Sequence, residues 1–364
     1  MNEATPDPLS TVPYLRWAKF ESGAGDIPLT ASAVPPITFE ELGLDPATLE
    51  LCTYSTYGDP AILRGVAEGW GRSEENVLLA SSTTHAHFCF AASHVEPGGV
   101  VLAESPGYTC LADSISCMRV NVVPFVRRFE DGYALPTDEI ESLVAEHAPS
   151  LLLVSHLHNP SGVALTDEEG AFLADLCERT GVVVLCDEIY RPFLDPDPGP
   201  LALRHPGIVS LWGLNKAYGI PQIRVGWGLA APERVERARR IVDSTTAHNS
   251  CLSDQVAAFA VPRLSTLAER AQGIARDGWH ALGRRLPELG FELVEPAGGV
   301  IGFPRHPWGG DLLRERLLAA GVGVTPGRFF GAPDHVRIGW ARPVAELEDA
   351  FARMQTCLEE GANA

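Results

Sequence analysis

The amino-acid sequence predicts an α/β protein with a large domain built around a mostly parallel β-sheet and a second, smaller domain. The first observation is that short apolar runs alternate with segments of helical period between about residues 76 and 249. This alternation is typical of a parallel sheet that is covered by helices on both faces. The second observation is a change near residue 250, where long helical patterns and short strands replace the alternation.

The pattern divides the chain into an N-terminal arm (1–45), a large domain (46–249) and a C-terminal smaller domain (250–364). In the arm, Tyr14–Phe20 and Phe39–Leu42 have helical spacing. The strands expected in the large domain are Asn76–Ala80, Gly99–Glu104, Val120–Val126, Ser150–Ser155, a run from Val182 to Asp187, Ile208–Leu211 and Val225–Leu229. Helices are expected from about Ala61, from His85, over Thr137–His147, from Thr166 and over Pro232–Asp243. In the smaller domain we expect helices over Ser253–Arg263, Ser265–Arg285 and Asp311–Ala320, and strands over Gly290–Val294 and Gly299–Phe303.

Composition excludes several classes of partner. The chain has 364 residues, which is long enough for two hydrophobic cores, and a formal net charge of -19. No basic surface for nucleic acids or anionic membranes is therefore expected. No apolar run approaches the roughly 18 residues of a membrane span, and Met1–Pro13 lacks the basic start and apolar core of a signal peptide. We expect a cytoplasmic protein without nucleic-acid or membrane partners.

The cysteines and histidines do not predict a metal site. The eight cysteines are scattered, with no C-x-x-C and no cysteine–histidine cluster of zinc spacing. Most of them lie in apolar runs, as is typical of buried free thiols in a reducing compartment. His85 and His87 lie two residues apart on a predicted helix, so their side chains point apart.

One short segment carries the residues around which the site is predicted. After the strand Ile208–Leu211 comes a single lysine, Lys216, and eight residues later an arginine, Arg224. A lysine in a partly desolvated pocket loses its proton more readily and becomes a nucleophile for carbonyls. Arg224 stands between apolar neighbours, where its planar, permanently charged fork suits a phosphate. The pair suggests pyridoxal phosphate held as a Schiff base, and the alternative is a surface lysine with a structural arginine.

A second segment favours pyridoxal phosphate. The apolar run from Val182 ends in Asp187, and Tyr190 follows three residues later. Pyridoxal chemistry requires an acid beside the pyridine nitrogen, so that the ring stays protonated and withdraws electrons. Open α/β sheets bind their ligands at the carboxyl ends of the strands, where Asp187 is expected.

Four motifs in this order resemble those of the class I and II aminotransferases of pyridoxal-phosphate fold type I. They are Asn159-Pro-Ser-Gly162, Asp187-Glu-Ile-Tyr190, Asn215-Lys216 and Arg224, and the resemblance extends from about residue 50 to 350. It implies a seven-stranded type of sheet and a smaller α+β domain to which the N-terminal arm contributes. It also implies a homodimer of two-fold symmetry with shared sites.

The resemblance assigns cofactor-binding roles to further residues. Asn159 and Tyr190 would contact the phenolic oxygen of the cofactor, and Tyr108 would stack on its ring. Ser82, Thr83 and Thr84, at the start of a helix, would offer backbone N–H groups to the phosphate, together with Arg224.

Two pairs of residues remain open at this point. Tyr54 and Tyr57 compete for the role of the family tyrosine that reaches the phosphate of the neighbouring subunit. His156 and His158 precede Asn159, and they either shape substrate choice or fill a loop.

The expected substrate is an amino acid. Arg337 stands in the apolar strand Val336–Trp340, and a buried guanidinium requires an anion. The resemblance implies the substrate α-carboxylate, with Asn159 beside it, whereas the structural alternative is an internal salt bridge. Lys216, once released from the cofactor, would move the Cα proton as general base and acid.

The sequence predicts the cofactor more specifically than it predicts the type of reaction. An aminotransferase is expected, and the alternatives are a C–S β-lyase acting on a cysteine conjugate or a decarboxylating or oxidative variant. Gly213, Asn215 and Thr83 depart from the family pattern, which hints at a specialised amino acid of secondary metabolism. No clear second arginine for a dicarboxylate is visible, although Arg305, Arg328 and Arg342 remain candidates.

Overall fold

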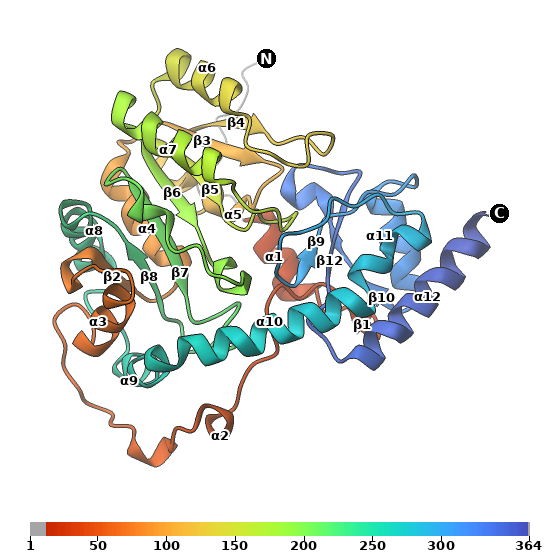
Figure 1. The fold of residues 1–364 in the computed structure, drawn as a ribbon, viewed down its shortest axis with the longest axis horizontal. Coiled ribbons are helices and arrows are strands. Elements are labelled where there is room, and N and C mark those ends of the chain that lie inside the picture. The colour runs from red at the N-terminus through yellow and green to blue at the C-terminus, as the bar shows by residue number, and fades with distance from the viewer. Residues whose placement is uncertain (1–11, 363–364) are drawn as a thin grey trace.

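A seven-stranded sheet forms the centre of the larger part of the molecule (Figure 1). The computed structural model describes residues 12–362, so the first eleven residues of the predicted arm lie outside the described part. The strand order is β2-β8-β7-β6-β5-β3-β4, and only β8 runs antiparallel to its neighbours. The strands are β2 (Val77–Ala80), β3 (Val100–Ser105), β4 (Asn121–Val126), β5 (Leu151–Ser155), β6 (Val183–Asp187), β7 (Ile208–Gly213) and β8 (Gly226–Leu229). The mostly parallel sheet predicted from the sequence is confirmed.

Helices cover both faces of this sheet. They are α3 (Pro60–Glu68), α4 (Thr83–His94), α5 (Cys110–Asp113), α6 (Thr137–His147), α7 (Asp167–Thr180) and α8 (Pro232–Thr245). Side chains of a strand alternate between faces. Leu151 and Leu153 of β5 therefore join the cluster under α4 and α8, whereas Leu152 and Val154 join the cluster under α6 and α7. Burial on both faces explains why these strands read as continuous apolar runs.

The smaller α+β part combines both ends of the chain. Its elements are α1 (Pro13–Phe20), β1 (Ile27–Pro28), α2 (Phe39–Leu42), α9 (Cys251–Ala260), α10 (Leu264–Ala281), β9 (Ile301–Gly302), α11 (Gly310–Ala319), β10 (Val322–Gly323), β11 (Thr325–Pro326), β12 (Val336–Gly339) and α12 (Val344–Ala362). Strand β1 pairs in parallel with β10, so the N-terminal arm is part of this unit. In Figure 1, α1 lies between the two parts, and the long helix α10 runs from one toward the other.

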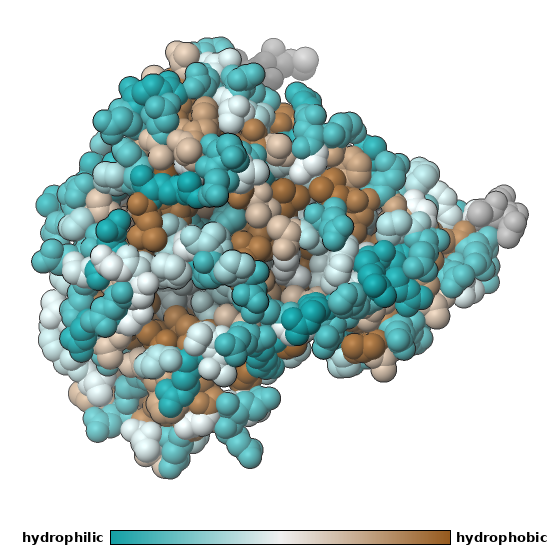
Figure 2. Space-filling model, viewed as in Figure 1, coloured by the Kyte–Doolittle hydropathy of each residue, from teal (hydrophilic) through white to brown (hydrophobic). Residues whose placement is uncertain are grey.

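Short 3₁₀ helices complete the connections. They are η1 (Pro46–Thr48), η2 (Glu74–Asn76), η3 (Ser116–Met118), η4 (Arg191–Phe193), η5 (Leu201–Leu203), η6 (Val261–Arg263), η7 (Gly283–Leu289) and η8 (Gly327–Phe330). Polar side chains cover most of the face drawn in Figure 2, as the acidic composition predicts. Among the described residues, no helix combines the length and hydrophobicity that a bilayer span requires.

The strand expected over Gly290–Val294 does not form. Glu292 makes only an isolated antiparallel bridge with Arg305. Glu292 and Arg305 exchange both of their backbone hydrogen bonds, at 3.0 and 2.9 Å.

One hydrophobic cluster extends through both parts of the molecule. It contains Leu29 from the arm, Trp212 from β7 and Trp340, which follows β12, all of them buried. The division into residues 1–45, 46–249 and 250–364 therefore stays a prediction. It divides the chain into segments, but these segments share this hydrophobic cluster.

Gly226 predicts a stability effect. A Cβ built on Gly226 would lie 2.2 Å from Thr83 N and 2.4 Å from Ser82 C, which are backbone atoms that cannot swing away. We expect Gly226→Ala to lower the free energy of unfolding by at least about 1–3 kcal/mol, measured by thermal or urea denaturation. Gly69→Ala is the matched control, because nothing lies within 4 Å of its added Cβ. Equal melting temperatures for the two variants would contradict this packing argument.

Candidate active site

Most of the predicted site residues line one cavity at the carboxyl ends of the central strands. They are Thr83, Thr84, Tyr108, Asn159, Asp187, Tyr190, Lys216 and Arg337. Ser82 lies next to them as the N-cap of α4. Parallel strands bring the segments after β5, β6 and β7 to the same sheet edge, which is where α/β sheets bind ligands.

Lys216 follows β7, and its amine is directed to a residue of the N-terminal arm. Lys216 Nζ donates a hydrogen bond to Ser32 Oγ at 2.7 Å. Burial lowers the pKa of Lys216 to about 8, with a further contribution from the charge of Arg337, while Asp187 acts in the opposite direction. A substantial fraction of this amine is therefore neutral near physiological pH, as a nucleophile requires.

Asp187 ends β6 inside the protein. It is buried, and Asp187 Oδ1 accepts the backbone N–H of Ile189 at 3.2 Å. Burial raises the pKa of Asp187 to about 7, against the effects of the Ile189 N–H group and of Lys216. A carboxyl group in this setting stabilises a cation placed beside it, such as a protonated pyridine ring.

Tyr190 presents a hydroxyl group from the loop after β6. Its hydroxyl donates to the backbone oxygen of Ser32 at 2.9 Å. Burial raises the pKa of Tyr190, so the phenol stays protonated and remains a hydrogen-bond donor.

Arg337 is a buried cation that has no acidic partner among the described residues. Arg337 Nη1 donates to Asn159 Oδ1 at 3.1 Å, and Nη2 donates to the Tyr14 hydroxyl at 2.9 Å. Its Nε is buried without a hydrogen-bond partner, and no ion pair with a carboxylate is formed within residues 12–362. By contrast, buried Arg127 pairs with Glu104 and buried Arg191 pairs with Glu188. The structural alternative, an internal salt bridge, is thus not observed.

The N-terminus of α4 forms the other end of the cavity. Ser82 Oγ accepts the backbone N–H of His85 at 3.0 Å. Thr83 is buried, and its Oγ1 has no hydrogen-bond partner. Gly213 and Gly226 approach this helix start so closely that a Cβ at either would be 3.0 Å or less from an atom of Thr83. An unpartnered hydroxyl and a helix N-terminus fit an anionic group such as the phosphate of the predicted cofactor.

Arg224 and Tyr54 do not line this cavity. Arg224 is exposed, has a φ of 58°, and donates from Nη1 to Pro221 O at 3.4 Å. It is close enough for its charge to help lower the pKa of Lys216. Tyr54 is 81% exposed and its ring lies against His248, while the Tyr57 hydroxyl donates to Asp243 Oδ2 at 3.2 Å.

Ser32 and Tyr14 are residues that sequence reasoning missed. Ser32 accepts from Lys216 and Tyr190, and Tyr14 supports Arg337, but both come from the arm. No motif marks either residue. A polar serine inside the proline-rich loop was the one signal available, and it is equally common in ordinary loops.

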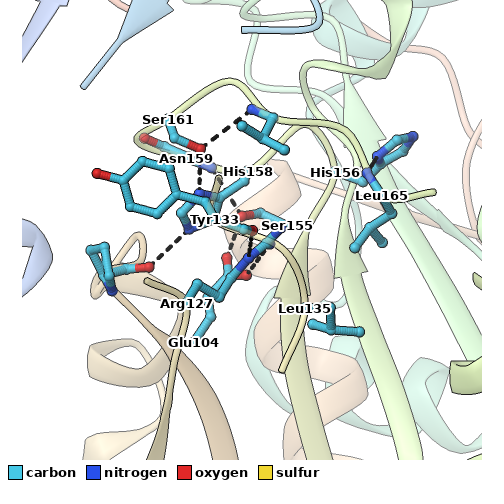
Figure 3. Close-up of polar contacts among 12 residues, drawn as sticks. Glu104, Arg127, Tyr133, Leu135, Ser155, His156, His158, Asn159, Ser161 and Leu165 are labelled. Atoms are coloured by element: carbon cyan, nitrogen blue, oxygen red, sulfur yellow. Dashed lines mark hydrogen bonds and ion pairs between the residues drawn. The ribbon is translucent and has the colours of Figure 1, made fainter. Parts of the chain in front are cut away.

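His156 and His158 do not line the cavity. Figure 3 shows both side chains and their hydrogen-bond partners. His156 Nδ1 accepts the backbone N–H of Leu165 at 3.1 Å, and burial lowers the pKa of His156 to about 4. His158 lies between Ser161 Oγ and Pro106 O. Because both histidines bond to residues of the loops around them, these contacts favour the alternative in which they fill a loop over the one in which they shape substrate choice. Among the described residues no cluster of His, Cys, Asp or Glu could hold a metal ion, His85 and His87 included.

The lowered pKa of Lys216 predicts how cofactor uptake depends on pH. Only the neutral amine has a lone pair for the aldehyde, so uptake by the apoprotein should accelerate roughly tenfold per pH unit below about 8 and level off above it. Stopped-flow absorbance between about pH 6 and 9.5 measures this rate. Lys216→Arg is the control, because a guanidinium stays protonated throughout this range and should show no covalent phase. A wild-type rate that does not change through pH 8 would contradict the prediction.

A desolvated lysine, a buried acid and a buried arginine that has no anionic partner in residues 12–362 line one cavity at the carboxyl edge of a seven-stranded sheet. Together they define a pyridoxal-phosphate-dependent enzyme of fold type I. The chain belongs to the class I and II aminotransferases, because the family model described as "Aminotransferase class I and II" matches residues 48–354.

Relatives and solved structures agree with this assignment. Capreomycidine synthase of Streptomyces vinaceus is 31% identical and covers 96% of this chain and 94% of its own length. An aspartate aminotransferase of Streptomyces avermitilis is 26% identical, with coverage of 86% and 85%. The structure of a PLP-dependent aminotransferase from Streptococcus suis superimposes with a TM-score of 0.90 at 22% identity, over 97% of this chain and 98% of the other. The chain is thus a pyridoxal-phosphate-dependent enzyme of the aminotransferase type, and these names do not favour the C–S lyase alternative.

Proposed function

We propose that this enzyme transfers the amino group of an α-amino acid whose only carboxylate is the one on Cα. The observation that carries the proposal is Arg337, which is 1% exposed, faces the cavity that holds Lys216, and has no acidic partner among the described residues. A desolvated cation of this kind is costly unless an anion joins it, and a carboxylate gripped by its fork meets that requirement.

The remaining charges argue against a second carboxylate in the substrate. Lys216 and Arg337 are the only basic side chains other than histidine that line the cavity in the described chain. The three arginines left open from the sequence are engaged elsewhere: Arg305 with Glu130 and Glu292, Arg328 with Asp311, and Arg342 with Glu346. A dicarboxylate would therefore bring a charge for which this cavity offers no counter-ion.

The cavity residues fit pyridoxal phosphate, and each has a proposed task. When bound, the cofactor withdraws electrons from the bonds of the substrate Cα and carries the amino group between two half-reactions. Lys216 would hold it through the amine and then move the proton at Cα, which a pKa of about 8 suits. Asp187 would keep the pyridine nitrogen protonated, while Tyr190 and Asn159 would donate to the ring oxygen.

Phosphate and ring contacts complete the proposal. The backbone N–H groups of Ser82, Thr83 and Thr84 at the start of α4 would bind the phosphate. Arg224 would join them from the rim, since its charge already acts on Lys216. Tyr108 would cover one face of the ring.

A homodimer is also proposed. The segment between α2 and α3 extends away from the body in Figure 1, and it exposes Leu51 by 85% and Tyr54 by 81%. Large apolar side chains exposed in this way are typical of contact surfaces. Tyr54 or Tyr57 would then reach the phosphate site of the second copy. Light scattering at micromolar concentration tests the dimer, and a monomeric holoenzyme would refute it.

A specialised substrate in the cytoplasm completes the proposal. The departures at Gly213 and Asn215 support secondary metabolism, as does the similarity to capreomycidine synthase.

The direct test is a half-reaction with a panel of amino acids. Holoenzyme is mixed with neutral, cationic and dicarboxylic amino acids, and both the loss of its visible absorption and the 2-oxo acid formed are measured. We expect conversion with monocarboxylates and at least about 100-fold lower efficiency with aspartate and glutamate, as for an uncompensated buried charge. Aspartate as the best donor would refute the substrate class. Pyruvate and thiol released from a cysteine conjugate, without conversion of the cofactor to its amine form, would refute transamination.

A further inference from the structure

Two loops that carry proposed cofactor contacts leave the sheet side by side. Strand β3 ends in the segment Glu104–Pro106 and leads to Tyr108, while the neighbouring parallel strand β5 ends at Ser155 and leads to Asn159. The separation of the Tyr108 ring and the Asn159 amide therefore depends on what joins these two loops. Figure 3 shows a continuous set of polar contacts between them.

Ser155 makes the first connection. Ser155 Oγ donates to Glu104 Oε1 and accepts the backbone N–H of Asn159 at 3.0 Å. Ser155 is 1% exposed, so water cannot replace either bond without rearrangement. One hydroxyl group thus ties the peptide of Asn159 to the end of β3.

The Glu104 carboxylate is itself fixed. Arg127 Nη1 donates to Glu104 Oε2 at 3.1 Å, and Arg127 Nε donates to Tyr133 O at 2.7 Å. Both side chains are almost completely buried. Ser155 is therefore hydrogen-bonded to a carboxylate whose position is fixed by a buried ion pair.

His158 makes the second connection. His158 Nε2 lies 2.8 Å from Pro106 O, which can only accept, so Nε2 carries the proton and donates. Nδ1 must then accept from the hydroxyl of Ser161, 2.6 Å away. Burial holds the pKa of His158 well below its usual range, so the ring stays neutral and keeps this one-donor, one-acceptor arrangement.

The Asn159 side chain links these connections to Arg337, the residue proposed to bind the substrate carboxylate. Asn159 Oδ1 accepts from Arg337 Nη1 at 3.1 Å, which leaves the amide Nδ2 as the donor directed to the cavity. Moving the Asn159 peptide would therefore disturb the donor to the cofactor and the support of Arg337 together.

We propose that Ser155 and His158 are positioning residues, which hold the Asn159 loop against the Tyr108 loop and so fix both the cofactor ring and the carboxylate-binding arginine. This inference rests on the proposed roles of Asn159, Tyr108 and Arg337. Neither positioning residue touches the cavity itself.

The test compares two buried serines of matched chemistry. Ser155→Ala removes the connection described above. Ser210→Ala removes an equivalent one, because Ser210 Oγ donates to buried Glu188 and accepts the backbone N–H of Ala202 at 2.9 Å, yet Ser210 does not contact the Asn159 loop. Both variants lose the same kind of bond and should lose similar thermal stability.

Only Ser155→Ala should alter the site. The visible absorption of the holoenzyme reports the pKa of the cofactor joined to Lys216. We expect this pKa to rise by about one unit in Ser155→Ala, because a displaced Asn159 amide no longer donates to the deprotonated ring oxygen and so no longer stabilises it. The KM values for the amino acid and for the 2-oxo acid should each rise about tenfold through Arg337, with a smaller change in kcat. Ser210→Ala should show neither effect. Equal effects in both variants, or no spectral shift in Ser155→Ala, would overturn the inference.

His158 provides an independent pair of variants. His158→Gln keeps a donor for Pro106 O, whereas His158→Leu keeps neither bond, so the spectral shift should be larger for His158→Leu. If Ser155→Ala does not fold, a His158→Leu holoenzyme with wild-type spectral pKa and KM overturns the inference. Wild-type protein that takes up no pyridoxal phosphate would instead refute the proposed function. Failure of the proposed function can therefore be told apart from failure of this inference.

Discussion

Lys216→Ala is expected to lower kcat/KM for the best amino acid by at least about 10⁴-fold, because it removes the residue proposed both to hold the cofactor covalently and to move the Cα proton. The visible absorption band should be lost, and borohydride reduction should no longer fix the cofactor to the chain. Steady-state kinetics and mass spectrometry of the reduced protein measure both effects.

The sequence offers an unusually clear control. Lys19 is the only other lysine of the chain, and it is exposed on α1. Lys19→Ala should keep the band, the label and the rate. If borohydride fixes the cofactor in Lys216→Ala as well as in the wild type, the assignment of Lys216 is wrong.

Arg337→Met is expected to separate function from stability. Loss of the fork proposed to bind the α-carboxylate should reduce kcat/KM by roughly 10²–10³-fold, mainly through higher KM values for both the amino acid and the oxo acid. The unfolding free energy should stay the same or increase, because the variant removes a desolvated charge and leaves no carboxylate unpaired behind it.

Arg127→Met is the matched control for this stability argument. Arg127 is as deeply buried as Arg337, but its removal leaves the Glu104 carboxylate without its cation. This variant should lose about 3–5 kcal/mol. A comparable loss in Arg337→Met, measured by urea denaturation of the apoproteins, would show that Arg337 has a structural role and would contradict the carboxylate assignment.

The fold was largely predictable because its signals are local. The central strands are buried on both faces, so each reads as an apolar run, and the helix predicted over Thr137–His147 is observed with those bounds. The smaller part was less predictable. Its two-residue strands, such as β1 and β10, depend on partners far away in the chain rather than on their own pattern.

Predictability of the site follows the same rule. Asp187 is the last residue of β6, and Lys216 follows the neighbouring strand β7. Because these strands are parallel neighbours, the sequence could predict that the two side chains lie in one cavity. Ser32 reaches Lys216 only because the backbone of its loop is held there, with Val34 N donating to Lys216 O at 3.0 Å. Arg224 was expected at the phosphate from its place in the sequence, but its side chain is exposed and its backbone has a φ of 58°, which the apolar neighbours do not predict.

The hydrophobic cluster that joins Leu29, Trp212 and Trp340 restricts how this gene can be rearranged. Recombination near residue 249 would divide one interior between two parents, so chimaeras should survive only where both halves carry complementary side chains. New specificities are thus more readily acquired by substitutions around the cavity than by exchange of whole segments.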